Sequence, residues 1–330
     1  MRGTVNLDLR ALIWDIDGVL VYVGDSYRKA IVETTQYYFT EIVGLGLDDY
    51  LLSIEDTQKF KMAGGFNNDW EITYGAVLCF LTGIISEIDS RGKCVNSLKD
   101  LPMMWDESHR GLDLDPVFKG TAAKGGGLAN LRNALVELYG GSEETAEKFW
   151  HTDLIKQLFQ EMYLGRDLFR KKYGFKPEHV KSKGFIRNEK PLTAQKLLSR
   201  LSERHIMGIA SGREHFEIDV VLKMHGFREF FNEEFIVGSD DFPSGKPDPS
   251  QLLECRKRIE EVKGFIGGGN IAYVGDVPDD VIAAKRAGFR SIGVTASIRN
   301  DSGKKRLREK LIDLGADFVV DELAELDEVI

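Results

Sequence analysis

The sequence predicts an α/β protein with a doubly wound parallel sheet and a large inserted α-helical domain. Strands alternate with helices after residue 185, a short apolar strand stands near residue 11, and the chain between them shows helical periodicity only. At 330 residues the chain also exceeds the ~250–300 at which single cores stop growing. We expect residues 1–21 and 185–330 to form the core and 22–184 the inserted domain.

The first strand ends in an unusual way. In "ALIWDIDGVLV", residues 11–21, an apolar run is followed by Asp15, Asp17 and Gly18. Gly18 allows the chain to turn sharply. Buried strands rarely end on two acidic residues, so Asp15 and Asp17 are candidate functional residues.

Four further segments of the second half are typical of strands. They are "HIMGIAS" (205–211), "EFIVGS" (234–239), "NIAYVGD" (270–276) and "RSIGVT" (290–295). The helical pattern "PDDVIAAKRAG" follows the third, and "KKRLREKLIDLGADFVV" follows the fourth. This alternation predicts βαβ units and a parallel sheet.

The inserted segment shows apolar residues at three- and four-residue intervals in four stretches, 25–43, 67–88, 127–140 and 142–174. Residues 90–116 and "FKGTAAKGGG" (118–127) are predicted to be loops, because they are rich in Gly, Pro or polar residues. The Gly-rich "KGGG" lacks the GK[ST] ending of a phosphate-binding loop.

The composition excludes several classes of protein. A formal net charge of −9 argues against a nucleic-acid binder. Three cysteines without CxxC spacing fit neither a disulfide framework nor a zinc site. The N-terminus lacks the apolar core of a signal peptide, and "AVLCFLTGII" is about half the ~20 residues of a membrane span. We therefore expect a cytoplasmic protein with no nucleic-acid or membrane partner.

Polar clusters follow the predicted strands or lie between them: "DIDG" (15–18), "ASGR" (210–213), "SGKPDPS" (244–250) and "GDVPDD" (275–280). Ligands of open parallel sheets bind at the carboxyl ends of the strands, so these clusters should converge. Carboxylates brought this close repel one another unless a cation neutralises them, and hard oxygen ligands select magnesium.

These four motifs, in this order, resemble those of the haloacid dehalogenase superfamily of aspartate-nucleophile hydrolases. The family pattern is "DxDG", a strand-end Ser or Thr, a Lys and "GDxxxD"; here it reads "DIDGVL", "IASG", "SGKPDP" and "GDVPDDVIAAKRAG". The resemblance covers residues 8–21 and 185–330. The inserted helical segment points to the helical-cap subfamily that includes phosphoglycolate phosphatase and β-phosphoglucomutase.

The resemblance implies a role for each motif residue. Asp15 would attack phosphorus and form an aspartyl-phosphate, and Asp17 would protonate the leaving alcohol and then activate water. The backbone carbonyl of Asp17 would also bind magnesium. Related dehalogenases and phosphonate hydrolases lack the second acid, so Asp17 points to phosphate-ester chemistry.

The remaining motif residues would bind phosphate and metal. Ser211 and the backbone amide of Gly212 would bind the phosphoryl oxygens, and Lys246 would balance their charge. Asp15 and Asp276 would bind magnesium, and Asp280 matches the second acid of the last motif; Asp279 is adjacent and a candidate for the same role. The structural alternative is that Asp279 and Asp280 only cap the helix that follows.

The inserted domain would be a mobile cap that excludes water and selects the substrate. "KFKMAGGFNNDWEITYG" offers Lys61, Asn67 and Asn68 around Gly64 and Gly65 as a substrate-reading loop. The open alternative is that Asn67 or Asn68 caps the next helix. Arg213 is a candidate contact for a second anionic group of the substrate, with an ordinary surface charge as the alternative.

The sequence thus predicts a magnesium-dependent phosphatase that hydrolyses a small phosphorylated metabolite through an aspartyl-phosphate. Two alternatives stay open: a sugar phosphomutase of the β-phosphoglucomutase type, and a non-catalytic sensor that binds a phosphorylated ligand. The sequence leaves the substrate and the oligomeric state undetermined.

Overall fold

A computed structural model describes residues 8–66, 69–105, 112–242 and 244–330. The chain divides into two compact units. Unit 1 comprises Met1–Val23 and Glu189–Ile330, and unit 2 comprises Gly24–Asn188.

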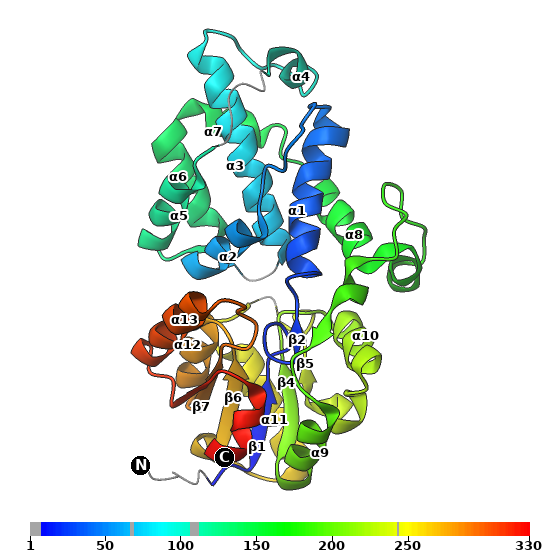
Figure 1. Cartoon of the computed structure of the whole chain (residues 1–330), viewed down its shortest axis with the longest axis vertical. Helices are drawn as coiled ribbons and strands as arrows, with labels where there is room; N and C mark the ends of the chain where they lie inside the picture. The colour runs from blue at the N-terminus through cyan, green and yellow to red at the C-terminus, as the bar shows by residue number, and fades with distance from the viewer. Residues whose placement is uncertain (1–7, 67–68, 106–111, 243) are drawn as a thin grey trace. The chain divides into compact units, whose positions relative to one another are not determined.

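Unit 1 contains a six-stranded parallel sheet in the order β5-β4-β1-β6-β7-β8 (Figure 1). Its strands are β1 Ala11–Trp14, β4 Ile206–Ala210, β5 Ile236–Val237, β6 Ile271–Gly275, β7 Arg290–Val294 and β8 Phe318–Val320. The first strand of the chain lies between β4 and β6, where the order of the strands reverses direction. Such a reversal point is where open α/β sheets bind their ligands.

The central strand β1 is wholly apolar and is paired with a neighbouring strand along both edges. All four residues of β1 are buried, and the strand pairs with β4 from Ala11↔Ile206 and with β6 from Ala11↔Ile271. A continuous apolar run is what a parallel strand with two covered faces requires. The predicted doubly wound α/β fold is confirmed.

Helices cover both faces of this sheet. Figure 1 shows α9 and α10 on one side and α12 and α13 on the other. The helices of unit 1 are α9 Gln195–Arg204, α10 His215–His225, α11 Ser250–Lys263, α12 Pro278–Ala287, α13 Asp301–Asp313 and α14 Leu326–Val329, with short 3₁₀ turns η3 Arg228–Phe230, η4 Glu233–Phe235, η5 Gly268–Asn270 and η6 Leu323–Glu325.

A buried apolar cluster joins the sheet to α11 and α12. It contains Ile13 of β1, Tyr273 of β6, Cys255 of α11 and Ala284 of α12, all fully buried. A Cβ on Gly208 of β4 would lie 2.6 Å from the Cys255 sulfur, so a glycine is needed where α11 crosses the strand. Cys255 is thus a free thiol that packs as an apolar side chain in this core.

A small ribbon joins the two segments of unit 1. β2 Val21–Tyr22 pairs antiparallel with β3 Lys190–Pro191, and the Leu192 amide donates to the Leu20 carbonyl at 2.9 Å. These segments border unit 2 along the chain. The ribbon therefore holds the end of the first segment of unit 1 against the start of the second segment.

The described residues of unit 2 form helices and connecting loops, with no strand among them. Its elements are α1 Tyr27–Tyr37, a π-helix η1 Tyr38–Val43, α2 Ile54–Ala63, α3 Asp69–Ser90, α4 Asp100–Met104, α5 Leu114–Ala123, α6 Gly127–Tyr139, α7 Gly141–Glu147, α8 Thr152–Tyr173 and a 3₁₀ turn η2 Phe185–Asn188. Within α3, residues Trp70–Ser90 are long and apolar enough to cross a membrane, but 72% of the relevant window is buried in the structure. That burial is typical of the core helix of a bundle, which passes the same test.

Two local predictions for the inserted segment were wrong. The predicted loop 118–127 is largely the end of α5, which Asp113 caps by accepting from the Asp115 amide. Gly120 allows α5 to pack closely against α6, because a Cβ at this position would lie 3.0 Å from the Ala134 side chain. The periodic stretch 142–174 is also interrupted, by a gap between α7 and α8 and by a non-helical Gly165.

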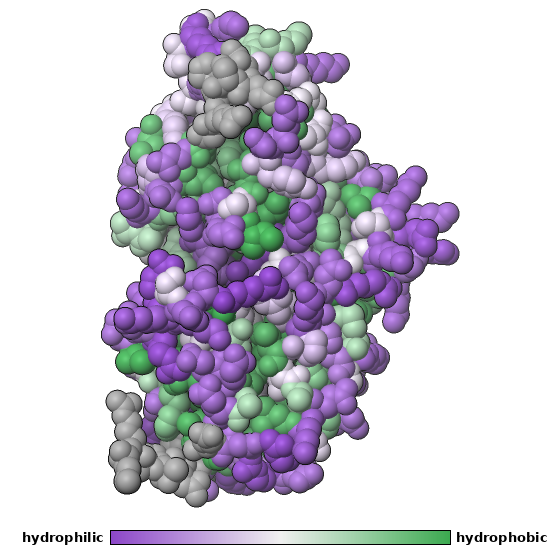
Figure 2. Space-filling view, viewed as in Figure 1, coloured by the Kyte–Doolittle hydropathy of each residue, from purple (hydrophilic) through white to green (hydrophobic). Residues whose placement is uncertain are grey.

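The surface matches the composition of the chain. Figure 2 shows hydrophilic residues over most of the visible face, with hydrophobic residues in separate small groups. Among large apolar side chains, Met103 and Phe265 are the most exposed of those described. Single exposed apolar residues of this kind are normal for a folded protein.

The central strand should dominate the stability of unit 1. We expect Ile13→Ala to lower the free energy of unfolding by ~2–5 kcal/mol, because it opens a cavity in the fully buried core. Ile312→Ala in α13 is the matched control, since Ile312 is 53% exposed and its loss should cost less than ~0.5 kcal/mol. Urea denaturation measures both; equal shifts of the midpoint would contradict this assignment of the core.

Candidate active site

Three adjacent strands of the sheet deliver polar side chains to one edge. Asp15 directly follows β1, Ser211 follows β4 and Asp276 follows β6. Strand-type hydrogen bonds continue one residue past β1 and β4, from the Asp15 amide to the Val274 carbonyl at 2.9 Å and from the Ser211 amide to the Val237 carbonyl at 3.1 Å. The backbone of these residues is therefore held as firmly as the strands themselves.

Lys246 lies at the centre of the polar cluster. Its Nζ donates to Asp15 Oδ2 at 2.7 Å and to the Tyr273 hydroxyl at 2.8 Å. It also lies 2.7 Å from Asp280 Oδ1, as a close ionic contact rather than a directed hydrogen bond. The ammonium group of Lys246 thus contacts two other segments of the chain, one that carries Asp15 and one that carries Tyr273 and Asp280.

Three carboxylates meet at this point. Ligand atoms of Asp15, Asp276 and Asp280 all lie within 4.8 Å of one another, and all three residues are buried. Three negative charges and the single positive charge of Lys246 leave a formal charge of −2. Buried carboxylate oxygens with an excess of two negative charges fit a hard divalent cation such as Mg²⁺.

Two glycines allow the carboxylates to pack this closely. Gly18 has φ +75°, and a Cβ there would lie 1.8 Å from Asp276 Oδ2. A Cβ on Gly275 would lie 2.3 Å from the Asp280 Cβ. The glycines of "DIDG" and "GDVPDD" are therefore required because each leaves space for an acidic residue of the last motif.

The electrostatics of the cluster reflect its burial. Desolvation raises the pKa of Asp15 to about 6, although Lys246 acts to lower it; Asp280 and Asp17 add to the rise. Burial acts to lower the pKa of Lys246, but Asp15 and Asp280 outweigh it and hold this pKa well above the usual value. Lys246 therefore stays protonated, and its one charge does not fully compensate the carboxylates.

Asp280 has two structural contacts in addition to its place in the cluster. Its Oδ2 accepts from the Asp276 amide at 2.9 Å and from the Val277 amide at 3.0 Å, which caps α12. Asp280 therefore lies in the carboxylate cluster and also caps α12, so both alternatives for this residue match a contact in the structure. Asp279 is half-buried and is not one of the three clustered carboxylates.

Ser211 and Gly212 begin the loop after β4. Ser211 is fully buried, and its hydroxyl accepts from the Arg213 amide at 3.4 Å. The buried Gln251 side chain donates to the Ser211 carbonyl at 3.3 Å and so holds this loop from α11. The hydroxyl and the adjacent amides have the chemistry to bind an oxyanion.

Arg213 is placed differently from its prediction. We expected it to contact an anionic group of the substrate, but its side chain is 1% exposed and pairs with two carboxylates of the protein. Nε and Nη2 donate to Asp17 Oδ1 at 2.8 and 2.5 Å, and Nη2 donates to Glu189 Oε1 at 3.0 Å. A guanidinium removed from water needs such partners, which the sequence did not reveal.

The predicted substrate-reading loop belongs to unit 2. Lys61 lies in the last turn of α2, and its carbonyl accepts from the Gly64 amide at 3.2 Å. Asn67 and Asn68 lie outside the described residues. The roles of these three residues stay predictions.

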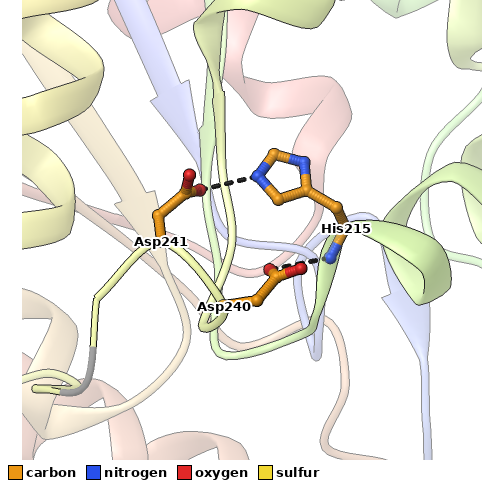
Figure 3. Close-up of side chains that lie close together, drawn as sticks. All are labelled: His215, Asp240 and Asp241. Atoms are coloured by element: carbon orange, nitrogen blue, oxygen red, sulfur yellow. Dashed lines mark hydrogen bonds and ion pairs between the residues drawn. The ribbon is translucent and has the colours of Figure 1, made fainter.

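A second group of potential metal ligands lies between α10 and the loop after β5 (Figure 3). His215 Nε2 lies 2.6 Å from Asp241 Oδ2, and the His215 amide donates to Asp240 at 3.0 Å. Asp241 also accepts from Arg258 at 2.8 Å and from the Gly238 amide at 2.8 Å. His215, Asp240 and Asp241 thus already have hydrogen-bond partners within the protein. We interpret them as a structural contact that holds the loop after β5 against α10.

Three residues of the site were not predicted from the sequence. Tyr273 links Lys246 to the Ala210 carbonyl, to which its hydroxyl donates at 2.9 Å. Ser297 Oγ donates to Asp276 Oδ2 at 3.3 Å, and Glu189 is the buried partner of Arg213. A tyrosine in the otherwise apolar "IAYVG" is the one signal that could have been noticed.

Comparison with known proteins shows the family of this chain. The family described as "Hydrolase: haloacid dehalogenase-like hydrolase" matches residues 9–288. The chain belongs to this family of hydrolases.

Individual relatives are more distant. An imidazoleglycerol-phosphate dehydratase of Phytophthora nicotianae is 23% identical over 288 residues, which is 87% of this chain and 43% of that protein. A phosphoglycolate phosphatase of Vibrio cholerae is 29% identical over 125 residues, 38% of this chain and 49% of that protein. The matches thus span less than half the length of these two relatives.

Solved structures confirm the fold. An X-ray structure from the Northeast Structural Genomics Consortium has a TM-score of 0.63 at 19% identity and covers 97% of this chain and 98% of its own. At this identity the likeness concerns the fold alone.

Removal of the central ammonium should destabilise the core in a pH-dependent way. In Lys246→Met, Asp15 and Asp280 stay buried without their cation, and we expect a loss of about 3–5 kcal/mol at pH 8. The loss should shrink at pH 5, because the pKa of Asp15, already raised to about 6, rises further and the carboxyl group becomes protonated and neutral.

Urea denaturation in the presence of a chelator measures this effect. Lys304→Met is the matched control, because Lys304 pairs with Glu322 at a more exposed position and should contribute at most ~1 kcal/mol. A loss for Lys246→Met that is the same at both pH values would refute the electrostatic explanation.

Proposed function

We propose that this protein is a magnesium-dependent phosphatase that hydrolyses a small phosphorylated metabolite through an aspartyl-phosphate on Asp15. The observation that carries the proposal is the buried Asp15 carboxylate, held by Lys246 beside Asp276 and Asp280 at the reversal point of the sheet. The family membership and the phosphoglycolate phosphatase relatives support the same chemistry.

In the first step Asp15 attacks phosphorus and the alcohol of the ester leaves. Ser211 and the amide of Gly212 bind the phosphoryl oxygens, and Lys246 balances charge at Asp15. Asp17 donates a proton to the leaving oxygen. In the second step the Asp17 carboxylate takes a proton from water, which then attacks the aspartyl-phosphate and restores Asp15.

The acidic cluster fits the metal ion of this proposal. Asp15, Asp276 and the backbone carbonyl of Asp17 would hold Mg²⁺, with Asp280 alongside. When bound, the ion supplies the positive charge that the cluster lacks and that a phosphate dianion requires.

Substrate selection is proposed to depend on unit 2. Lys61, Asn67 and Asn68 are the candidates for substrate contact, and the unit is proposed to act as a cap that excludes water. The cytoplasm is the proposed site of action.

The nucleophile is tested by Asp15→Asn, which changes one oxygen to a nitrogen with little change in shape. We expect phosphate release from a panel of phosphate esters with Mg²⁺ to fall by at least ~10³-fold, because the amide cannot form the covalent intermediate. Asp313→Asn at the exposed end of α13 is the control and should keep full activity.

Two outcomes would contradict the proposal. Activity of Asp15→Asn near that of the parent would exclude Asp15 as the nucleophile. If the parent released phosphate at background level while isomerising a hexose phosphate, the phosphomutase alternative would replace the hydrolase.

Magnesium affinity should depend on pH through Asp15. The metal binds the carboxylate form, and in the metal-free protein burial raises the pKa of Asp15 to about 6. We therefore expect the dissociation constant to be flat above pH 7 and to rise about tenfold per pH unit below 6. Calorimetric titration of chelator-treated protein with MgCl₂ measures this; a constant affinity from pH 7.5 to pH 5 would contradict it.

A further inference from the structure

The contacts of Asp17 are distinct from those of Asp15. Asp15 is bound by a lysine within the metal-type cluster, whereas Asp17 is bound by Arg213, and the Asp17 side chain is 18% exposed. Both bonds from the guanidinium go to the same oxygen, Oδ1. The described bonds from Arg213 to Asp17 thus reach Oδ1 and not Oδ2.

Arg213 is itself held in place from several directions. Its amide donates to Ser211 Oγ, and its carbonyl accepts from the Ser239 amide at 2.9 Å. Its side chain also bonds to Glu189, whose carboxylate is fully buried. A planar guanidinium fixed in this way offers its donors in one orientation only.

Glu189 connects this pair to the β2–β3 ribbon. It is the first residue of the second segment of unit 1 and directly precedes β3. Asp17 precedes β2 by a short turn in which the Gly18 amide donates to the Val21 carbonyl at 2.9 Å. Arg213 thus joins, through two carboxylates, both segments of unit 1 that border the inserted unit.

We propose that Arg213, oriented by Glu189, is a positioning residue that fixes Asp17 through Oδ1 so that Oδ2 is the oxygen that exchanges the proton with the ester and with water. This inference rests on the proposed phosphatase function. It replaces the expectation that Arg213 binds the substrate. Glu189 compensates the buried charge of Arg213, so that the guanidinium does not depend on Asp17 alone.

The inference predicts which steps depend on Arg213. An alkyl phosphate needs a proton for its leaving oxygen in the first step and a base for water in the second. p-Nitrophenyl phosphate has a leaving group that needs no proton, so only its second step depends on Asp17. A misplaced Asp17 should therefore slow both steps for the alkyl ester but only the second for the aryl ester.

The experiment compares Arg213→Lys, Glu189→Gln and Asp17→Asn with the parent, using p-nitrophenyl phosphate and the alkyl phosphate that the parent hydrolyses best. For Arg213→Lys we expect steady-state kcat on the alkyl ester to fall about 10- to 100-fold, with KM changed less than about threefold. With the aryl ester, rapid mixing should show a burst of about one equivalent of p-nitrophenolate and then slow turnover. Asp17→Asn should show the same pattern more strongly, and Glu189→Gln more weakly.

Arg290→Lys is the matched control. Arg290 forms an exposed pair with Asp317 at 2.8 Å and should show parent kinetics on both substrates. Thermal unfolding of each variant is measured alongside. Because Glu189→Gln leaves Arg213 and Asp17 in place, it tests the inference even where Arg213→Lys folds poorly.

Three results would overturn the inference: unchanged kinetics of Arg213→Lys and Glu189→Gln, equal losses on both esters without a burst, or a rise in KM with kcat unchanged. The last would indicate a substrate contact. If the parent hydrolysed neither ester, the proposed function itself would fail, which is a different result from an active parent whose variants lack the pattern.

Discussion

The buried ammonium of Lys246 is the interaction on which the site depends. It lies 2.7 Å from both Asp15 and Asp280, in a place where carboxylates would otherwise repel one another. Burial raises the pKa of Asp15 to about 6, because the attraction of Lys246 only partly offsets the loss of solvation and the repulsion from Asp280 and Asp17. The three carboxylates and the one ammonium group thus leave a buried negative charge that a divalent cation would neutralise.

The fold provides this cluster through close packing of backbone segments. Gly18 leaves space for Asp276 and Gly275 leaves space for Asp280, so the first and last motifs interlock. The reversal of strand order brings β4, β1 and β6 together, and each of these strands is followed by a polar residue of the site. The same arrangement places Arg213 against Asp17, so that the two acidic residues of "DIDG" receive different cationic partners.

Much of the fold could be predicted because its signals are local. The apolar runs before Asp15, Ser211 and Asp276 predicted strands, since a parallel sheet covered on both faces needs continuous apolar segments. The interior of the inserted unit was less predictable. Gly120 was interpreted as part of a loop, yet it lies in a helix where a side chain would press on Ala134, and a contact between separate helices leaves no periodic signal.

The sequence by itself determined the class of sheet and the residues of four motifs, because residue type and order along the chain carry that information. Only the tertiary structure decided which charges are paired. Arg213 was assigned to a substrate from its sequence position, whereas burial beside Asp17 and Glu189 gives it protein partners. Tyr273 and Glu189 were missed for the same physical reason: their polar contacts join residues far apart in the chain, and burial makes those contacts necessary.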